Sequence, residues 1–99
     1  MPLEWNLTAE SYLDQLPSVE RSKVLHAVEQ LSSNWDRLEG TRLHRLVGGQ
    51  NDLYSLRAGS DLRVLVLRRG DLITVVDVVR KSQIDGLRRV TERNQAAFG

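Results

Sequence analysis

The N-terminal part of the chain begins with a strand pattern and continues with helical periodicity. Residues 3–7 alternate apolar and polar side chains, as a β-strand with one buried face does. Thr8 is a suitable cap for a short helix that runs to about Gln15. Pro17 then separates this helix from the next element.

A second helix is predicted from Ser18, which is a good N-cap residue, to about residues 32–34. Its apolar residues recur at spacings of three and four, which is typical of an amphipathic helix with one buried stripe. The residues of this stripe are Val24, Leu25, Val28 and Leu31.

Beyond Gly40 the periodicity becomes two-fold and the segments become short. Glycine-bearing turns separate these segments, which favours hairpins and therefore a mainly antiparallel sheet. The predicted strands are Arg42–Val47, Leu53–Arg57, Leu62–Arg68 and Leu72–Val79. After Ser82, apolar residues at helical spacing predict a final helix.

The last two predicted strands are apolar at nearly every position, so both of their faces should be protected from water. The two early helices can cover only one face. The other must be covered by the C-terminal helix, by a partner, or by both. The predicted fold is α+β in a single domain, residues 1–99. An N-terminal strand and a helical hairpin pack on a mainly antiparallel sheet of four to five strands, followed by a C-terminal helix.

The composition limits the kinds of functional site that we expect. The chain has no cysteine, and His26 and His44 are its only histidines, so we expect neither a metal site nor a cofactor. It has no apolar run of the roughly 20 residues that span a bilayer, and no secretory signal pattern at its N-terminus. These features predict a cytoplasmic protein that does not contact a membrane.

The overall net charge of +1 hides an uneven distribution. Residues 1–41 contain three basic and seven acidic residues, a net charge of −4, whereas residues 42–99 contain eleven basic and six acidic residues, a net charge of +5. A surface that recognises a polyanion should therefore lie in the second part of the chain.

Two segments of this basic part carry a resemblance to a known family. Leu53–Val66 (LYSLRAGSDLRVLV) and Leu72–Lys81 (LITVVDVVRK) resemble the "LRxGdyRvly … vlvldvghRrevY" core of the RelE/ParE toxins of bacterial toxin–antitoxin systems. The similarity extends over roughly residues 3–90, because the predicted helical hairpin also resembles that of the family.

The resemblance implies a toxin with a cognate antitoxin protein as its partner. Ribonuclease members of the family, the mRNA interferases, cleave messenger RNA, commonly on the ribosome, and thereby inhibit translation. A metal-independent endoribonuclease is the function that the resemblance favours. Two alternatives remain: a gyrase-directed toxin of the same fold, and a non-catalytic RNA- or protein-binding relic of it.

The resemblance also implies site residues. Arg63 matches an arginine implicated in holding the scissile phosphate, and Arg80 and Lys81 match basic or histidine positions just after the last strand. We take these three as candidate catalytic residues. The candidate substrate-binding residues are Arg57, which matches a basic residue of the preceding strand, Arg45 and His44.

Cleavage of RNA by its own 2′-hydroxyl needs a proton acceptor, cations that stabilise the charged transition state, and a proton donor for the leaving 5′-oxygen. Arginine supplies only the cations, because it stays protonated. Lys81 could exchange a proton if burial or the neighbouring Arg80 made it less basic. His44 carries a side chain suited to proton transfer near neutral pH, but it lies outside the positions of the family motif.

The register of the last hairpin should decide which of these residues share a face. A two-residue loop at the predicted turn would place Arg63 opposite Val76, on the same face as Arg80. A three-residue loop would shift the register by one residue and place Arg63 on the face of Asp77 and Lys81. The family spacing favours the second register, in which Asp77 could orient Arg63.

One segment departs from the family pattern. Ribonuclease members often carry a tyrosine a few residues after the last strand, where this chain has Ile84, Asp85, Gly86 and Leu87. No aromatic group is therefore expected there to stack on a base or to assist proton transfer.

Overall fold

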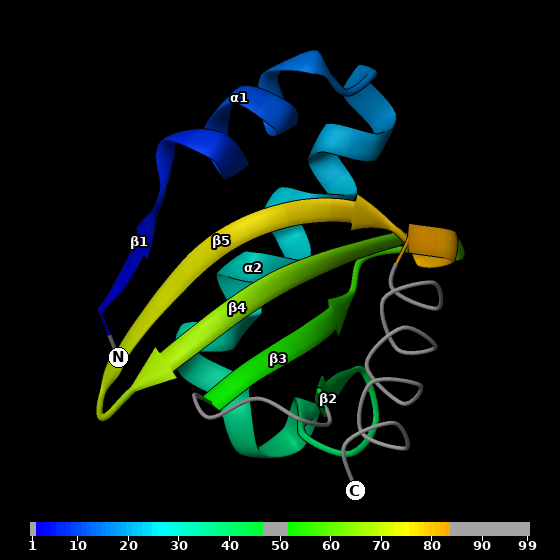
Figure 1. Cartoon of the computed structure of the whole chain (residues 1–99). Helices are drawn as coiled ribbons and strands as arrows, with labels where there is room; N and C mark the ends of the chain where they lie inside the picture. Colours follow the sequence, from blue (N-terminus) through cyan, green and yellow to red (C-terminus); the bar gives the residue numbers. More distant parts are fainter. Residues whose placement is uncertain (1, 47–51, 84–99) are drawn as a thin grey trace, which may run out of the picture.

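The computed structural model describes residues 2–46 and 52–83. Its elements, in chain order, are β1 (Leu3–Trp5), α1 (Leu7–Gln15), α2 (Ser18–Leu38), β2 (Leu43–Arg45), β3 (Asp52–Arg57), β4 (Leu62–Arg69) and β5 (Leu72–Arg80). The strands form one sheet in the order β1-β5-β4-β3-β2 (Figure 1). β1 runs parallel to β5, and every other neighbouring pair is antiparallel. The predicted α+β class and mainly antiparallel sheet are confirmed.

Helix α1 starts earlier than predicted because a different residue caps it. Asn6, not Thr8, occupies the N-cap, and its Oδ1 accepts a hydrogen bond from the backbone N–H of Ala9 at 2.8 Å. Asparagine is among the best N-cap residues, so the helix includes Thr8 in its first turn.

Helix α2 is longer than predicted. Ser18 is its first residue rather than its cap, because Pro17 takes the cap position without a side-chain hydrogen bond. The predicted end at residues 32–34 coincides with a kink at Asn34, whose φ of −130° and ψ of 27° are not helical. Beyond the kink the helix continues to Leu38, and it buries Trp35.

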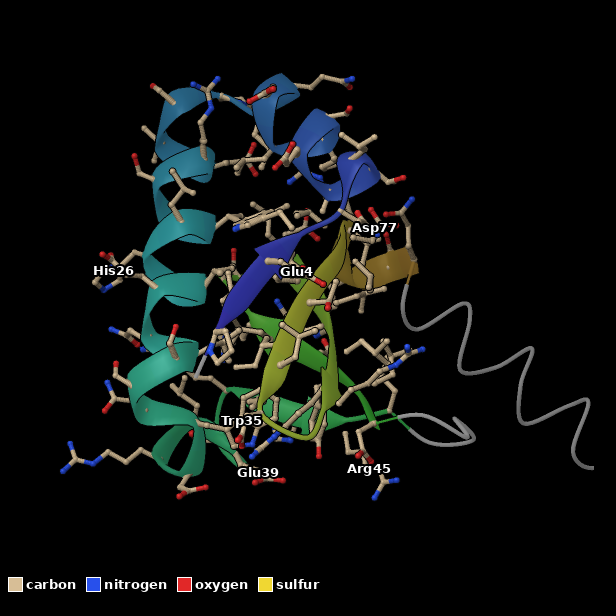
Figure 2. All side chains as sticks on the ribbon, turned by 90° about the vertical axis from the view of Figure 1, so that its left-hand side faces the viewer. Glu4, His26, Trp35, Glu39, Arg45 and Asp77 are labelled. Carbon is tan, nitrogen blue, oxygen red and sulfur yellow. The ribbon has the colours of Figure 1, made fainter. Side chains whose placement is uncertain are left out.

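The core lies between α2 and one face of the sheet. Trp35 lies between this helix and the strands (Figure 2), where its ring meets the ring of Tyr54 edge-on at 4.9 Å. The guanidinium of Arg68 stacks over Trp35 at 4.8 Å, which is cation–π distance. Leu25, predicted to face inward, is 46% exposed. The sheet contributes Leu43, Leu56, Val64, Val66, Ile73, Val75 and Val78 to the core.

The turn between β4 and β5 differs from both predicted loops. Arg69 pairs with Leu72, so the loop consists of Gly70 and Asp71. Gly70 has a φ of +58°, which suits the first central position of a type II′ hairpin turn. The loop therefore begins one residue later than the predicted two-residue loop and two residues later than the predicted three-residue loop.

A β-bulge between β4 and β5 shifts the register further. Val66 pairs with Val75, whereas the preceding residue of β4, Leu65, pairs with Asp77, so Val76 is the extra residue. Arg63 consequently lies opposite Val79, a register that neither predicted loop gives.

The second face of the sheet is turned away from α1 and α2 (Figure 1). We call it the open face. Residues 81–83, at the start of the predicted C-terminal helix, are helical, and the rest of that prediction lies outside the described residues. Within the described ranges, neither α1 nor α2 has the length and apolar character needed to cross a membrane.

Candidate nucleic-acid interface

Three arginines lie side by side on β4, on β3 and at the residue that precedes β2. Residues directly opposite each other in an antiparallel pair share a face, and Arg57 lies opposite Arg63. Extending the β2–β3 register by one residue places Arg42 opposite Arg57, and the N–H of Arg57 donates to the carbonyl oxygen of Arg42 at 2.8 Å. We call Arg42, Arg57 and Arg63 the arginine row. It lies on the open face, because its members alternate with core residues such as Leu43 and Leu56.

A single carbonyl group holds two of these side chains. Arg57 Nε donates to the carbonyl oxygen of Gly59 at 3.3 Å, and Arg63 Nη1 donates to the same oxygen at 3.1 Å. Arg63 Nη1 also donates to the carbonyl oxygen of Leu62 at 2.9 Å. Gly59 has a φ of +136°, a conformation that residues with a side chain rarely adopt. The glycine thus allows the β3–β4 turn to aim its carbonyl group at both guanidinium groups.

The arginine row has no carboxylate partner within the described residues, where the ion pairs are Arg45–Asp52, Arg80–Glu20 and Arg80–Asp61. Like charges that face each other directly across two strands destabilise a sheet. A pair of opposed arginines without a counter-charge is therefore a position where a bound anion would be stabilising.

His44 lies next to the arginine row on the same face. It pairs with Ser55, which is two residues from Arg57 along β3. His44 and Arg57 are therefore diagonal neighbours, whose Cα atoms are typically about 7–8 Å apart. His44 Nε2 lies 2.9 Å from the carbonyl oxygen of Thr41. A carbonyl oxygen can only accept, so Nε2 carries a hydrogen, and in the neutral form of the ring Nδ1 has the lone pair that can accept a proton.

Asp77 is half-buried on the open face, where it pairs with Leu65. Figure 2 shows its side chain on the side of the sheet away from α2. It shares a face with Arg63, as one predicted register had it. Its Oδ1 accepts from the N–H of Val78 at 2.8 Å, whereas Arg63 donates to backbone carbonyl groups, so the predicted contact between Asp77 and Arg63 is not formed.

Arg80 belongs to the opposite face. It pairs with the core residue Leu62, and its Nη1 donates to Glu20 Oε2 of α2 at 2.6 Å and to Asp61 Oδ2 at 3.3 Å. The hydrogen bond from Arg80 lowers the pKa of Glu20, and the same bond raises the pKa of Arg80. The prediction that a two-residue loop would place Arg63 and Arg80 on one face is therefore wrong, because the bulge and the later turn change the register.

Lys81 directly follows β5, two residues beyond the partner of Arg63, and its side chain is exposed. Its backbone N–H donates to the carbonyl oxygen of Asp61 at 2.7 Å, which ties the end of β5 to the β3–β4 turn. Lys81 is thus placed at the same end of the sheet as the arginine row.

Arg45 lies apart from the row. It alternates with His44 along β2, the strand at the edge of the sheet, and it forms an ion pair with Asp52 at 3.1 Å. Of the six predicted site residues, the sheet brings Arg57, Arg63 and His44 together.

Comparison with known proteins identifies the fold. No protein-family model matches the sequence, and no curated protein matches it. Among solved structures, RelE in the RelE–RelB complex of Pyrococcus horikoshii is 20% identical, with a TM-score of 0.66 over 81% of this chain and 93% of that one. The chain has the RelE toxin fold. The expected resemblance is thereby confirmed at the level of the fold.

Two further toxin structures share this fold. YafQ from Escherichia coli is 10% identical, with a TM-score of 0.67 over 83% of this chain and 94% of that one. The YoeB–YefM complex from Staphylococcus aureus is 17% identical, with a TM-score of 0.61 over 80% of this chain and 94% of that one. At such low identities the comparisons show the fold alone. The function of this RelE-fold chain must therefore be argued from its own residues.

The residue of this RelE-fold site that sequence reasoning missed is Arg42. The predicted strand Arg42–Val47 contained the signal, because Arg42 and His44 are two residues apart and so share a face. What was missing was the register of β2 on β3, which sets Arg42 opposite Arg57.

Proposed function

We propose that this protein is the toxin of a bacterial toxin–antitoxin system, a cytoplasmic endoribonuclease that cleaves messenger RNA on the ribosome without a metal ion. The observation that carries the proposal is the opposed pair of Arg57 and Arg63, tethered to one carbonyl oxygen and without a carboxylate partner in the described ranges. Guanidinium groups match the geometry of phosphate oxygens, and they stay protonated at any pH that a cell reaches.

In the proposed reaction the arginine pair holds the scissile phosphate and stabilises the charge of the transition state. The 2′-hydroxyl oxygen attacks the phosphorus and its proton passes to His44 Nδ1, which the hydrogen bond to Thr41 leaves free to accept it. The bond to the 5′-oxygen breaks, and the ammonium group of Lys81 protonates that oxygen. The products are a 2′,3′-cyclic phosphate and a 5′-hydroxyl end.

The proposed partner, an antitoxin protein, would cover the open face. This face carries apolar side chains that are only half-buried within the chain: Leu53, Leu65 and Leu67. A half-buried apolar strip beside a basic row suits a partner that offers apolar and acidic side chains. Structures of the same fold include complexes of a toxin with an antitoxin.

The test is to induce the protein in bacteria without an antitoxin and to map transcript ends. We expect growth arrest and new transcript ends with 5′-hydroxyl groups. Arg63→Gln should abolish both effects. Arg69→Gln is the matched control, because Arg69 lies on the same strand and the same face at the far end of the hairpin.

Three outcomes would contradict the proposal. Undiminished cleavage by a folded Arg63→Gln variant would reject the site. Intact transcripts accompanied by DNA damage would indicate a gyrase-directed toxin instead. Salt-sensitive RNA binding without cleavage would indicate a non-catalytic relic.

A further inference from the structure

A small depression beside the β3–β4 turn shares only Arg57 with the reaction just described. It is lined by Arg42, Arg57, Gly59 and Ser60. Arg42 and Ser60 are exposed, and none of the ion pairs of the described residues involves either arginine. The depression therefore presents two cationic side chains and a hydroxyl group with no carboxylate to neutralise them.

We propose that this depression binds a second phosphate of the RNA chain, adjacent to the scissile one, with Arg42 and Arg57 as its ligands. The inference rests on the proposed function, because it assumes that Arg63 and Arg57 hold the scissile phosphate. It adds a second binding position and assigns Arg42 a role.

The geometry of the arginine row supports two phosphate positions rather than one. Neighbouring strands lie about 4.8 Å apart, so the backbones of Arg42 and Arg63 are separated by two strand spacings, about 10 Å. Arg57 lies between them. Its backbone N–H donates to the carbonyl oxygen of Arg42, and its side chain donates to the same Gly59 carbonyl oxygen as the side chain of Arg63. A nucleotide chain that crosses the strands along this row would present successive phosphates to successive arginines.

The chemistry of the depression favours a phosphodiester over other anions. Two guanidinium groups supply several N–H donors in fixed planes, which suits the tetrahedral oxygens of phosphate. The hydroxyl of Ser60 can donate to a phosphate oxygen or to a ribose 2′-hydroxyl. Such contacts position a nucleic acid without reading its sequence.

The first test measures how RNA affinity depends on salt. Each phosphate that a protein neutralises on a single strand contributes about 0.7 to the slope of log K against log salt concentration. Arg42→Gln should lower the slope for a short oligoribonucleotide by about 0.7, measured by fluorescence anisotropy between about 50 and 200 mM salt. Arg37→Gln is the control, because Arg37 is exposed on α2, which covers the other face. Equal slopes for Arg42→Gln and wild type would overturn the proposal.

The second test varies the number of phosphates in the ligand. A dinucleotide with one internal phosphate should bind wild type and Arg42→Gln equally, because it fills only the scissile position. A trinucleotide with two internal phosphates should bind the variant several-fold more weakly. If both ligands lose the same affinity, Arg42 acts on the scissile phosphate and the second position does not exist.

The endoribonuclease activity and the second phosphate position can be rejected independently of each other. If the wild type cleaves RNA and Arg42→Gln changes neither slope nor trinucleotide affinity, the second position is rejected and the endoribonuclease stands. If binding depends on Arg42 but no RNA is cleaved, the proposed activity is rejected and the phosphate position stands.

Discussion

Arg57 and Arg63 share one hydrogen-bond acceptor, the carbonyl oxygen of Gly59, although the two residues face each other directly across neighbouring strands. The shared acceptor reduces their freedom to move apart, so their mutual repulsion is retained in the folded protein. A protein that keeps such an arrangement has sacrificed some stability, and a bound anion would recover it.

We predict that Arg57→Gln is more stable than the wild type. Removing one of two opposed like charges should raise the free energy of unfolding by about 0.2–1 kcal/mol, while RNA affinity falls. Urea denaturation measures the first quantity and anisotropy the second. A loss of stability greater than about 1 kcal/mol would show instead that contacts of Arg57 outweigh the repulsion.

A second prediction concerns Gly59. A β-carbon there would meet only Lys23 Cδ at 3.6 Å, an ordinary contact, so the cost of Gly59→Ala comes from the backbone at φ +136°. We expect a loss of about 1–3 kcal/mol in the free energy of unfolding. Because the carbonyl group that holds Arg57 and Arg63 must move, RNA affinity should also fall.

Gly70→Ala is the control for this experiment. Gly70 also has a positive φ, +58°, and open space around it, but it lies in the β4–β5 turn at the other end of β4. Its replacement should cost stability and leave RNA affinity unchanged. If both variants weaken RNA binding alike, loss of fold rather than of the shared acceptor is the cause.

The pair of Glu20 and Arg80 predicts a pH-dependent stability. The hydrogen bond from Arg80 lowers the pKa of Glu20 below its ordinary value of 4.5, so the unfolded chain takes up a proton at higher pH than the folded one. The stabilisation is therefore complete above about pH 4.5 and is lost as the pH falls through the lowered pKa of the folded state. Glu20→Gln should melt below the wild type at pH 7, and the two melting temperatures should converge in acid. A difference that stays constant with pH would contradict the role of the ionised carboxylate.

Two leucines of α2 test the packing of the core. Leu31 is fully buried, whereas Leu25 is 46% exposed. Leu31→Ala should lower the free energy of unfolding by about 2–5 kcal/mol through lost burial and the cavity left behind. Leu25→Ala, with the same chemical change on the same helix, should cost well under half as much. Similar losses for the two variants would mean that α2 is rotated relative to the sheet.

Much of the fold could be predicted from the sequence, because its elements depend on local patterns. The four strands after Gly40 and the helix with Val24, Val28 and Leu31 were predicted from periodicity alone, and their bounds differ from those of the structure by a few residues. Asn34 shows why ends are harder to predict: a residue that favours ending a helix only kinks α2, because burial of Trp35 and Leu38 rewards its continuation.

The site was only partly predictable. Arg57, Arg63 and His44 could be named from motif and residue type, but Arg42 could not, since nothing in its own neighbourhood shows that it lies opposite Arg57. Arg80 is the converse case. The resemblance to the RelE/ParE core suggested that it shares a function with Arg63, and the structure pairs it with Glu20 on the opposite face.

The sequence by itself thus determined which residues alternate, which segments are joined as hairpins, and that the second part of the chain is basic. Only the tertiary structure decided which residues face each other, through the bulge at Val76, the later turn at Gly70, and the parallel pairing of β1 with β5. The physical reason is that alternation is a property of a single strand, whereas register depends on contacts between distant segments. A shift of one residue moves every side chain of a strand to the other face.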